Sequence, residues 1–64
     1  MKDTVWVVEQ RTQYDGDVEL TVTTNRDSAV RMYQANKGDA DAWVGYCLSR
    51  WENGHFVEHE METD

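Results

Sequence analysis

The sequence has one cysteine, few basic side chains and no long apolar run, and each shortage excludes a class of protein. Cys47 cannot form an intramolecular disulfide, and with no second cysteine it cannot build a thiolate zinc site. No stretch approaches the ~18 apolar residues of a membrane-spanning helix, and the apolar part of the N-terminal segment is too short for a signal-peptide core. We therefore expect a soluble, cytoplasmic protein that has no membrane partner and is stabilised by packing.

The charge balance is strongly acidic. The 64 residues include 13 acidic and 6 basic side chains, which give a formal net charge of -7. Binding to nucleic-acid backbones depends on Lys and Arg displacing counterions from phosphates, so direct binding to DNA or RNA is not expected. A protein partner with a basic surface suits this chain better. The length allows one small domain, residues 1–64, which is marginally stable and has little mass for a buried catalytic cleft.

Two segments in the first half of the chain have strand character. Residues 4–12 are rich in β-formers, and residues 18–23 alternate apolar with polar side chains. A three-residue turn that ends at Asp17, with Gly16 left-handed, is expected to join them and to pair Leu20 with Thr12. The face to be covered by a helix would then carry Trp6, Val8, Val18, Leu20 and Val22.

The second half of the chain predicts one helix and two more strands. Thr24-Asn25 can cap a helix near residues 26–36, and Gly38 is expected to end that helix in the left-handed conformation. Strand character resumes at residues 42–51 and 55–61. The predicted fold is therefore α+β in the order β-β-α-β-β, with a four-stranded, mostly antiparallel sheet and one helix on one face.

The Asn53-Gly54 pair predicts a tight type I′ hairpin, which sets the faces of the last two strands. A regular register pairs Trp51 with Phe56, Ser49 with Glu58, and Cys47 with Glu60. The core face of this hairpin would carry Val44, Tyr46, Leu48, Val57, His59 and Met61. The other face would carry Trp43, Cys47, Trp51, Phe56, Glu58 and Glu60.

A single helix leaves large apolar side chains on the opposite face of the sheet. Trp43, Trp51 and Phe56 would lie there beside Val5 and Val7. Because aromatic side chains dominate the energetics of protein interfaces, we interpret this face as an interface with another copy of the chain or with a foreign protein. The alternative is a register shifted by one residue, or a helix that covers this face instead.

The C-terminal segment adds a concentration of carboxylates. Residues 58–64 contain four of them. The acidic residues assigned to partner binding are Glu52, Glu58, Glu60, Glu62, Asp15 and Asp17, with Glu19 beside them. They can imitate a row of phosphates and occupy the basic groove of a nucleic-acid-handling protein. Alternatively, they only keep the protein soluble, and residues 62–64 can form a disordered acidic tail.

No pattern in the sequence identifies a reaction or a cofactor. His55 and His59 lie roughly 13 Å apart on a regular strand, too far to share one ion. Asp39-Ala40-Asp41 is similar to the start of a calcium loop, but the residues that follow break the ligand pattern. Cys47 faces a carboxylate, which would raise the pKa of its thiol. We therefore predict no catalytic, cofactor-binding or metal-binding residues, and a protein that is not an enzyme.

The layout resembles that of very small bacteriophage-encoded proteins. The resemblance is carried by the start TVWVVEQ, the Asp-Gly turn, the segments NRDSAV and SRWENG, and the charged tail. That group includes inhibitors of host RNA polymerase and of CRISPR effectors (anti-CRISPR proteins). The resemblance is one of size, layout and charge, and it transfers no functional residues. It implies a stoichiometric inhibitor in the host cytoplasm.

Two functions follow from these observations. In the first, the chain binds and inhibits a larger protein with a basic groove, as a nucleic-acid mimic in counter-defence or host takeover. In the second, it is a self-associating homodimeric module whose acidity serves only solubility.

Overall fold

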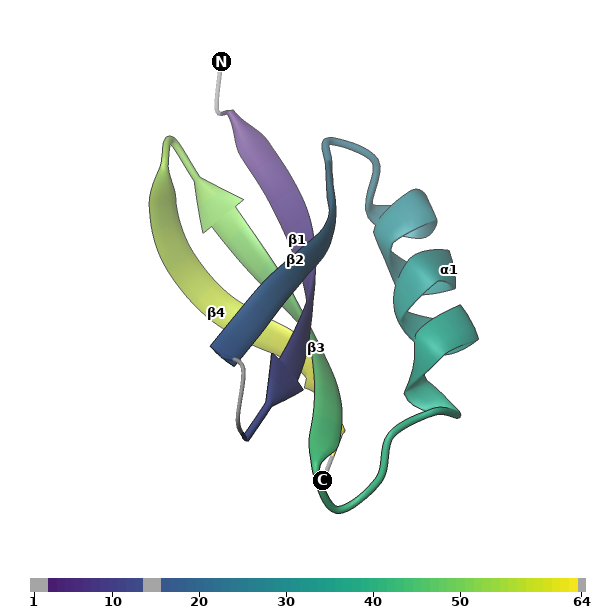
Figure 1. Ribbon diagram of the computed structural model, residues 1–64. Helices are drawn as coiled ribbons and strands as arrows, with labels where there is room; N and C mark the ends of the chain where they lie inside the picture. The colour runs from purple at the N-terminus through teal and green to yellow at the C-terminus, as the bar shows by residue number, and fades with distance from the viewer. Residues whose placement is uncertain (1–2, 14–15, 64) are drawn as a thin grey trace.

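A four-stranded antiparallel sheet with one helix on one face makes up the fold (Figure 1). The computed structural model describes residues 3–13 and 16–63. The elements are β1 (Thr4–Thr12), β2 (Gly16–Thr23), α1 (Arg26–Lys37), β3 (Val44–Glu52) and β4 (His55–Glu62). The predicted α+β class and element order are confirmed.

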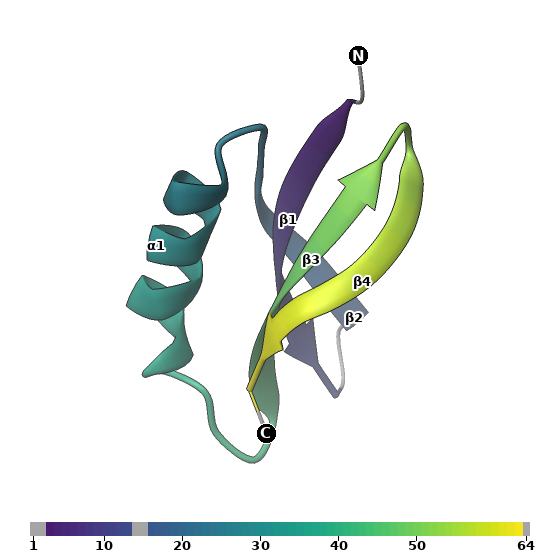
Figure 2. The same ribbon diagram turned by 180° about the vertical axis from the view of Figure 1, so that it is seen from behind.

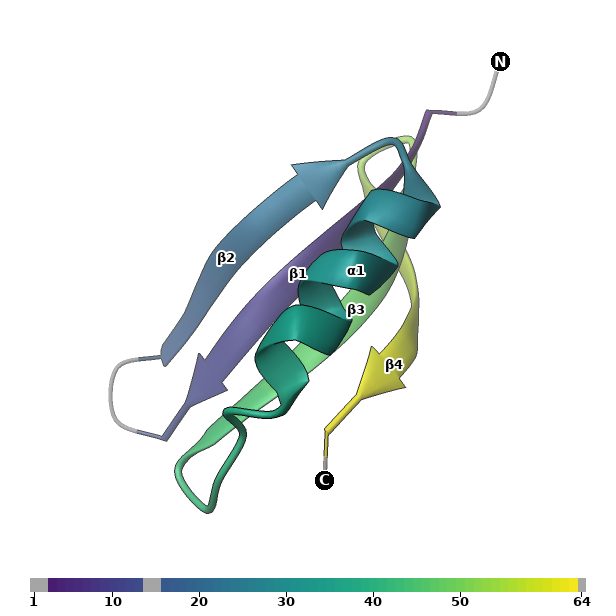
Figure 3. The same ribbon diagram turned by 90° about the vertical axis from the view of Figure 1, so that its right-hand side faces the viewer.

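The strand order, which the sequence left open, is β2-β1-β3-β4. Because β1 pairs antiparallel with both β2 and β3, the chain must cross from one side of β1 to the other between these two strands, and α1 makes that crossing. Figure 3 shows α1 in front of β1 and β3, with β2 and β4 on either side. The central strands are therefore the ones that the helix covers.

The core lies between α1 and the sheet. Ala29 and Tyr33, one helical turn apart, are the buried residues of α1. They pack against Val8, Tyr46 and Leu48 from the two central strands. Partly buried side chains that surround this cluster are Trp6, Leu20, Val30, Ala40, Val44 and Met61.

The ends of α1 match the sequence prediction at the start and differ at the end. Asn25 caps the helix, since its side-chain oxygen accepts a hydrogen bond from the Ser28 amide at 3.2 Å. Gly38, predicted to be left-handed, has φ -66° and ψ -18°. The chain leaves the helix through a tighter right-handed turn instead, in which the Asp39 amide donates to the Asn36 carbonyl at 2.9 Å.

The first hairpin has a different register from the predicted one. Gln10 lies opposite Val18, and Val7 lies opposite Val22, with a bulge beside Val8 that makes Leu20 the extra residue. The bulge moves Val22 to the opposite face, where it is 53% exposed, while Leu20 packs on the core. Val18 stays on the helix side of this edge strand but is 46% exposed.

The predicted turn of this hairpin is only partly described. Tyr14 and Asp15 lie outside the described residues. Gly16 is left-handed as predicted, with φ +77°, and lies opposite Thr12.

The second hairpin begins as predicted and then departs from the regular register. Asn53 and Gly54 have φ +54° and +81°, and Trp51 lies opposite Phe56. Two bulges in β4 then shift the pairing by one residue each. After the first of them, Ser49 lies opposite His59 rather than Glu58.

Because of the same bulges, some residues of β4 lie on a different face from the one predicted. Cys47 lies opposite Glu62 rather than Glu60, and Glu58 moves to the helix side of the sheet opposite Arg50. His59, predicted for the core face, moves to the opposite face. Each extra residue in β4 exchanges the faces of the residues that follow it.

Substitutions at Gly54 and Gly38 provide a matched test of the left-handed turn at Asn53-Gly54. Replacing Gly54 by Ala should lower the free energy of unfolding by about 1 kcal/mol, because a left-handed conformation costs an L-residue ~1–2 kcal/mol. Gly38→Ala should leave stability unchanged or slightly raised, because its φ is negative. A Cβ at either position meets no atom within 4 Å, so only the backbone conformation differs. Equal unfolding midpoints for the two variants in a denaturant titration would contradict this assignment.

Candidate protein-interaction site

The face of the sheet opposite α1, which we name the open face, has no helix or strand over it within residues 3–13 and 16–63 (Figures 1 and 2). Strand pairing identifies the residues on this face. They are Val5, Val7, Glu9 and Arg11 of β1; Asp17, Glu19 and Val22 of β2; Gly45, Cys47, Ser49 and Trp51 of β3; and Phe56, His59 and Glu62 of β4.

The open face is divided along the strands into two halves. The apolar half, at the start of β1, consists of Val5, Val7, Val22, Trp51 and Phe56. The charged half, at the end of β1, consists of Glu9, Arg11, Asp17, Glu19 and Glu62. His59 lies between the two halves. An apolar patch and an acidic patch are therefore contiguous on one surface.

The Trp51 side chain is held to the sheet by a hydrogen bond in the apolar half. Its indole Nε1 donates a hydrogen bond to Ser49 Oγ at 3.2 Å, and Ser49 Oγ donates to the Val7 carbonyl at 3.4 Å. Val7, Cys47 and Ser49 are 6%, 0% and 1% exposed although no further layer covers them. Long side chains of the open face itself therefore shield the middle of the sheet from water.

The Phe56 ring lies at the exposed edge of this aromatic cluster. It makes an edge-to-face contact with Trp51, with ring centroids 5.7 Å apart, and a second one with His59 at 4.9 Å. Phe56 is 48% exposed, and Val22 across the sheet is 53% exposed. Trp51 is half-buried and fixed in position, so it supports the ring that faces solvent.

The charged half contains one guanidinium among several carboxylates. Arg11 Nη2 lies 3.3 Å from the ring nitrogens of His59, and its Nη1 lies 3.6 Å from Glu62. Both contacts are directed across β3 toward β4. On the other side of β1, Glu9 lies directly opposite Glu19. The arginine therefore points away from this pair of like charges.

The pKa of the Cys47 thiol, which lies on the same face, is affected by these charged groups. Burial raises its pKa, Arg11 lowers it, and Glu9, Asp17 and Glu62 raise it further. The net effect is a raised pKa, which keeps the thiol protonated and makes it a poor nucleophile. Strand pairing places these three carboxylates, each from a different strand, on the same face as Cys47.

The Glu60 carboxylate lies on the helix side of the sheet. It is the extra residue of a bulge in β4, and its side chain is 11% exposed. Its oxygens accept hydrogen bonds from Arg26 Nε at 2.8 Å and from Trp6 Nε1 at 3.1 Å, with Arg50 at 3.9 Å. Burial acts to raise its pKa, but these hydrogen bonds and positive charges outweigh burial, so the pKa of Glu60 is lowered.

The acidic residues predicted for partner binding do not form one row. Glu58 pairs with Arg50 at 3.6 Å and, like Glu60, lies on the helix side, whereas Glu62 and Asp17 lie on the open face. Glu52 is the last residue of β3, opposite both Thr4 and His55. Asp15 is outside the described residues. The arginines that pair with the C-terminal carboxylates come from distant elements, which the local sequence of the tail does not reveal.

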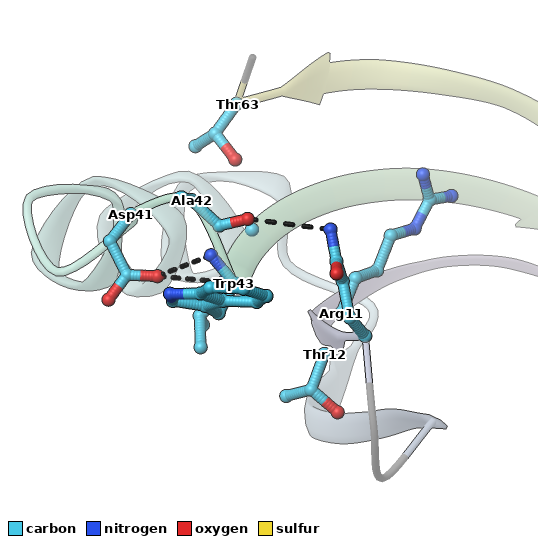
Figure 4. A pocket seen from close by; sticks show the side chains of 9 residues that line it. Arg11, Thr12, Asp41, Ala42, Trp43 and Thr63 are labelled. Atoms are coloured by element: carbon cyan, nitrogen blue, oxygen red, sulfur yellow. Dashed lines mark hydrogen bonds between the residues drawn. The ribbon is translucent and has the colours of Figure 1, made fainter.

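Trp43 lies apart from the other two aromatic residues. It is 55% exposed and precedes β3, eight positions before Trp51, which corresponds to roughly 26 Å along a strand. It lines a shallow cavity of about 250 Å³ together with Arg11, Thr12, Gln13, Asp41, Ala42, Val44, Gly45 and Thr63 (Figure 4). Trp43 therefore does not extend the apolar half.

The polar groups around this cavity are used within the protein. Asp41 Oδ1 accepts hydrogen bonds from the amides of Trp43 and Val44, at 2.7 and 2.9 Å. Thr63 exchanges two hydrogen bonds of 2.9 Å with the backbone of Tyr46. Glu62 and Thr63, expected in a disordered tail, thus belong to the sheet and its hydrogen bonding; Asp64 lies outside the described residues.

Sequence analysis missed Arg11 and Val22 as members of the open face, and it placed His59 on the wrong side. Val22 and His59 reach this face because of bulges, for which alternation along a single strand contains no signal. Arg11 follows Val5 and Val7 by simple alternation along β1, so the sequence did contain the signal for it.

Residues 3–13 and 16–63 contain neither a candidate metal site nor a membrane-spanning helix. No group of three or more His, Cys, Asp or Glu side chains that could hold a metal ion occurs in the part of the chain that the structure describes. Within that same part, no helix has the length and apolar character needed to cross a membrane. No protein family, curated protein or solved structure matches the chain. The open face therefore supplies the observations on which a function can be proposed.

Glu60→Gln should lower the free energy of unfolding at neutral pH by about 1–2 kcal/mol, because it removes charge-assisted hydrogen bonds from a mostly buried group. A lowered native pKa means that this stabilisation is complete above the ordinary glutamate value of 4.5 and is lost as the pH falls through the native pKa. The difference between the two proteins should therefore shrink in acid. The measurement is denaturant unfolding between neutral and acidic pH.

Glu58→Gln is the matched control for this prediction. The Glu58 side chain is 54% exposed and lies 3.6 Å from Arg50, so its loss should change stability little at any pH. If both variants lost the same stability, the assigned role of Glu60 would be wrong.

Proposed function

We propose that the protein is a small acidic interaction protein that binds a larger protein through the open face. The observation that carries this proposal is the exposed Phe56 ring, supported by the half-buried Trp51, on a face that also carries Glu9, Asp17 and Glu19. The partner that fits has an apolar patch beside a basic one. Binding inhibits the partner by covering its basic surface.

The apolar half supplies the binding energy in this proposal. Phe56 is presented on a Trp51 ring that the sheet already holds in place, so little side-chain freedom is lost when a partner covers it. Aromatic residues in such supported positions are typical interface hot spots. Val22 and Val5 extend the same apolar surface across the strands.

The charged half supplies attraction at long range. Its four carboxylates outnumber its one arginine, and the whole chain has a net charge of -7. Such a field speeds encounter with a basic surface and makes the association rate depend on salt. Nucleic-acid mimicry, in phage counter-defence or host takeover, is the form of inhibition that this charge supports. Its carboxylates would be those of the open face, without Glu58 and Glu60.

A homodimer is the second candidate, favoured by the exposure of Phe56 and Val22. A second copy would bury both residues, but it would also bring together two chains of charge -7. We therefore expect a monomer at micromolar concentration and physiological salt in analytical ultracentrifugation. A dimer that Phe56→Ala dissociates would instead support self-association as the role of this face.

The two halves should have different kinetic roles. In a surface-based binding assay against a protein captured from host lysate, Phe56→Ala should raise the dissociation rate about tenfold or more, because buried packing is lost after encounter. The double neutralisation Asp17→Asn and Glu19→Gln should slow association and flatten its dependence on salt.

Matched controls lie elsewhere on the surface. Trp43→Ala removes an exposed aromatic side chain outside the apolar half, and Asp27→Asn with Asp39→Asn removes two exposed charges outside the open face. Both should leave the kinetics nearly unchanged. If either control weakened binding as much as its counterpart, the open face would not be the binding surface.

A further inference from the structure

The two edges of the sheet are protected to different degrees from pairing with another strand. The outer strand β4 contains two bulges, and one of its extra residues, Glu60, is turned toward the helix side. The other outer strand, β2, contains one bulge, at Leu20, and pairs only with β1 among the described residues. Figure 3 shows β2 to the side of α1, not beneath it. The outer edge of β2 is therefore more open to another strand.

The residues of β2 give it only part of the usual protection of an edge strand. Natural edges are blocked by charged side chains, especially lysine, by proline and by bulges, and β2 has one bulge and two carboxylates. The segment from Gly16 to Thr23 contains no Lys, Arg or Pro. It presents Val18 and Val22, which are 46% and 53% exposed, on its two faces. An alternating strand with basic side chains on the open face and apolar ones on the helix side could bury Val18.

The charges of β2 point to the chemistry of such a strand. Glu19 lies directly opposite Glu9, an arrangement that destabilises a strand pair, and Asp17 follows on the same face. Arg11, the cation of this face, is directed toward His59 and Glu62 on β4 instead. Lysine or arginine side chains on a strand added outside β2 would compensate this repulsion.

We propose that β2 accepts an extended basic segment of the partner as an additional strand of the sheet. This inference rests on the proposed function, because it assigns a binding mode to the same basic partner. Basic side chains of the added strand lie beside Asp17 and Glu19 on the open face, and an apolar one lies beside Val18 on the helix side. Main-chain hydrogen bonds supply affinity, and the charges select the sequence.

A second copy of this chain is a poorer occupant of the same edge. Pairing two β2 strands would bring Asp17 and Glu19 of both copies into one ladder, with no basic residue in either strand. Like charges across strands are destabilising, so charge complementarity favours a basic strand.

The test uses a blocked heptapeptide of alternating lysine and valine, added to the full chain. Binding is followed by calorimetry, and amide hydrogen exchange is compared between β2 and β4. We expect slower exchange in β2 and no change in β4. An analogue with N-methyl groups on alternate residues keeps the charge but loses main-chain donors. It should bind about tenfold or more weakly, since each lost hydrogen bond is worth ~1 kcal/mol.

A charge reversal at Glu19 distinguishes an effect on peptide binding from an effect on the stability of the free protein. Glu19→Lys should weaken peptide binding about tenfold by removing an ionic contact and adding repulsion, while the free protein becomes no less stable because the Glu9–Glu19 repulsion is gone. Asp39→Lys makes the same change of charge in the loop after α1. It should weaken binding by no more than about threefold through the overall field.

The possible results distinguish this inference from the proposed function. If the N-methylated peptide binds equally well, or β2 amides are not protected, strand addition is overturned, while dependence on Phe56 would still support the open face. If the heptapeptide does not bind at all, strand addition is also overturned. The proposed function then fails only if the open-face variants also leave the kinetics with the captured protein unchanged.

Discussion

One helix of 12 residues can cover only one face of a four-stranded sheet, and the rest of the structure follows from this limit. The core between α1 and the central strands buries large side chains such as Tyr33, Tyr46 and Leu48. The other face must exclude water from its backbone with its own side chains. Trp51 does so by lying along β3, where its indole is hydrogen-bonded to Ser49. The features that stabilise the open face are thus the ones that make it suitable for binding.

The charged side chains are also distributed unevenly between the two outer strands. Three of the six basic residues, Arg11, Arg26 and Arg50, contact carboxylates of β4 and hold this outer strand against the rest of the sheet. Basic charge used in this way is not free to neutralise β2, where Asp17 and Glu19 lie. The net charge of -7 is therefore unevenly distributed over the sheet. Ion pairs hold the β4 edge, whereas the β2 edge carries the carboxylates of Asp17 and Glu19.

The sequence was sufficient to predict the elements and the fold class, because these depend on local signals. Alternation, the Asn25 cap and the Asn53-Gly54 turn each operate within a few residues. The faces of the outer strands depend on bulges, which insert one residue without changing composition. For this reason Val22, Glu58 and His59 lie on the face opposite to the predicted one. The partners of Glu60 were equally hidden, since Trp6 and Arg26 are 54 and 34 residues away.

The position of Cys47 has a practical consequence. The only cysteine of the chain is fully buried at the centre of the open face, beneath side chains and not beneath another element. A thiol reagent can reach it only when those side chains move aside or the strands separate. Its rate of alkylation thus measures how often the sheet opens from this side, and a ligand seated on the open face should slow that rate without touching the sulfur.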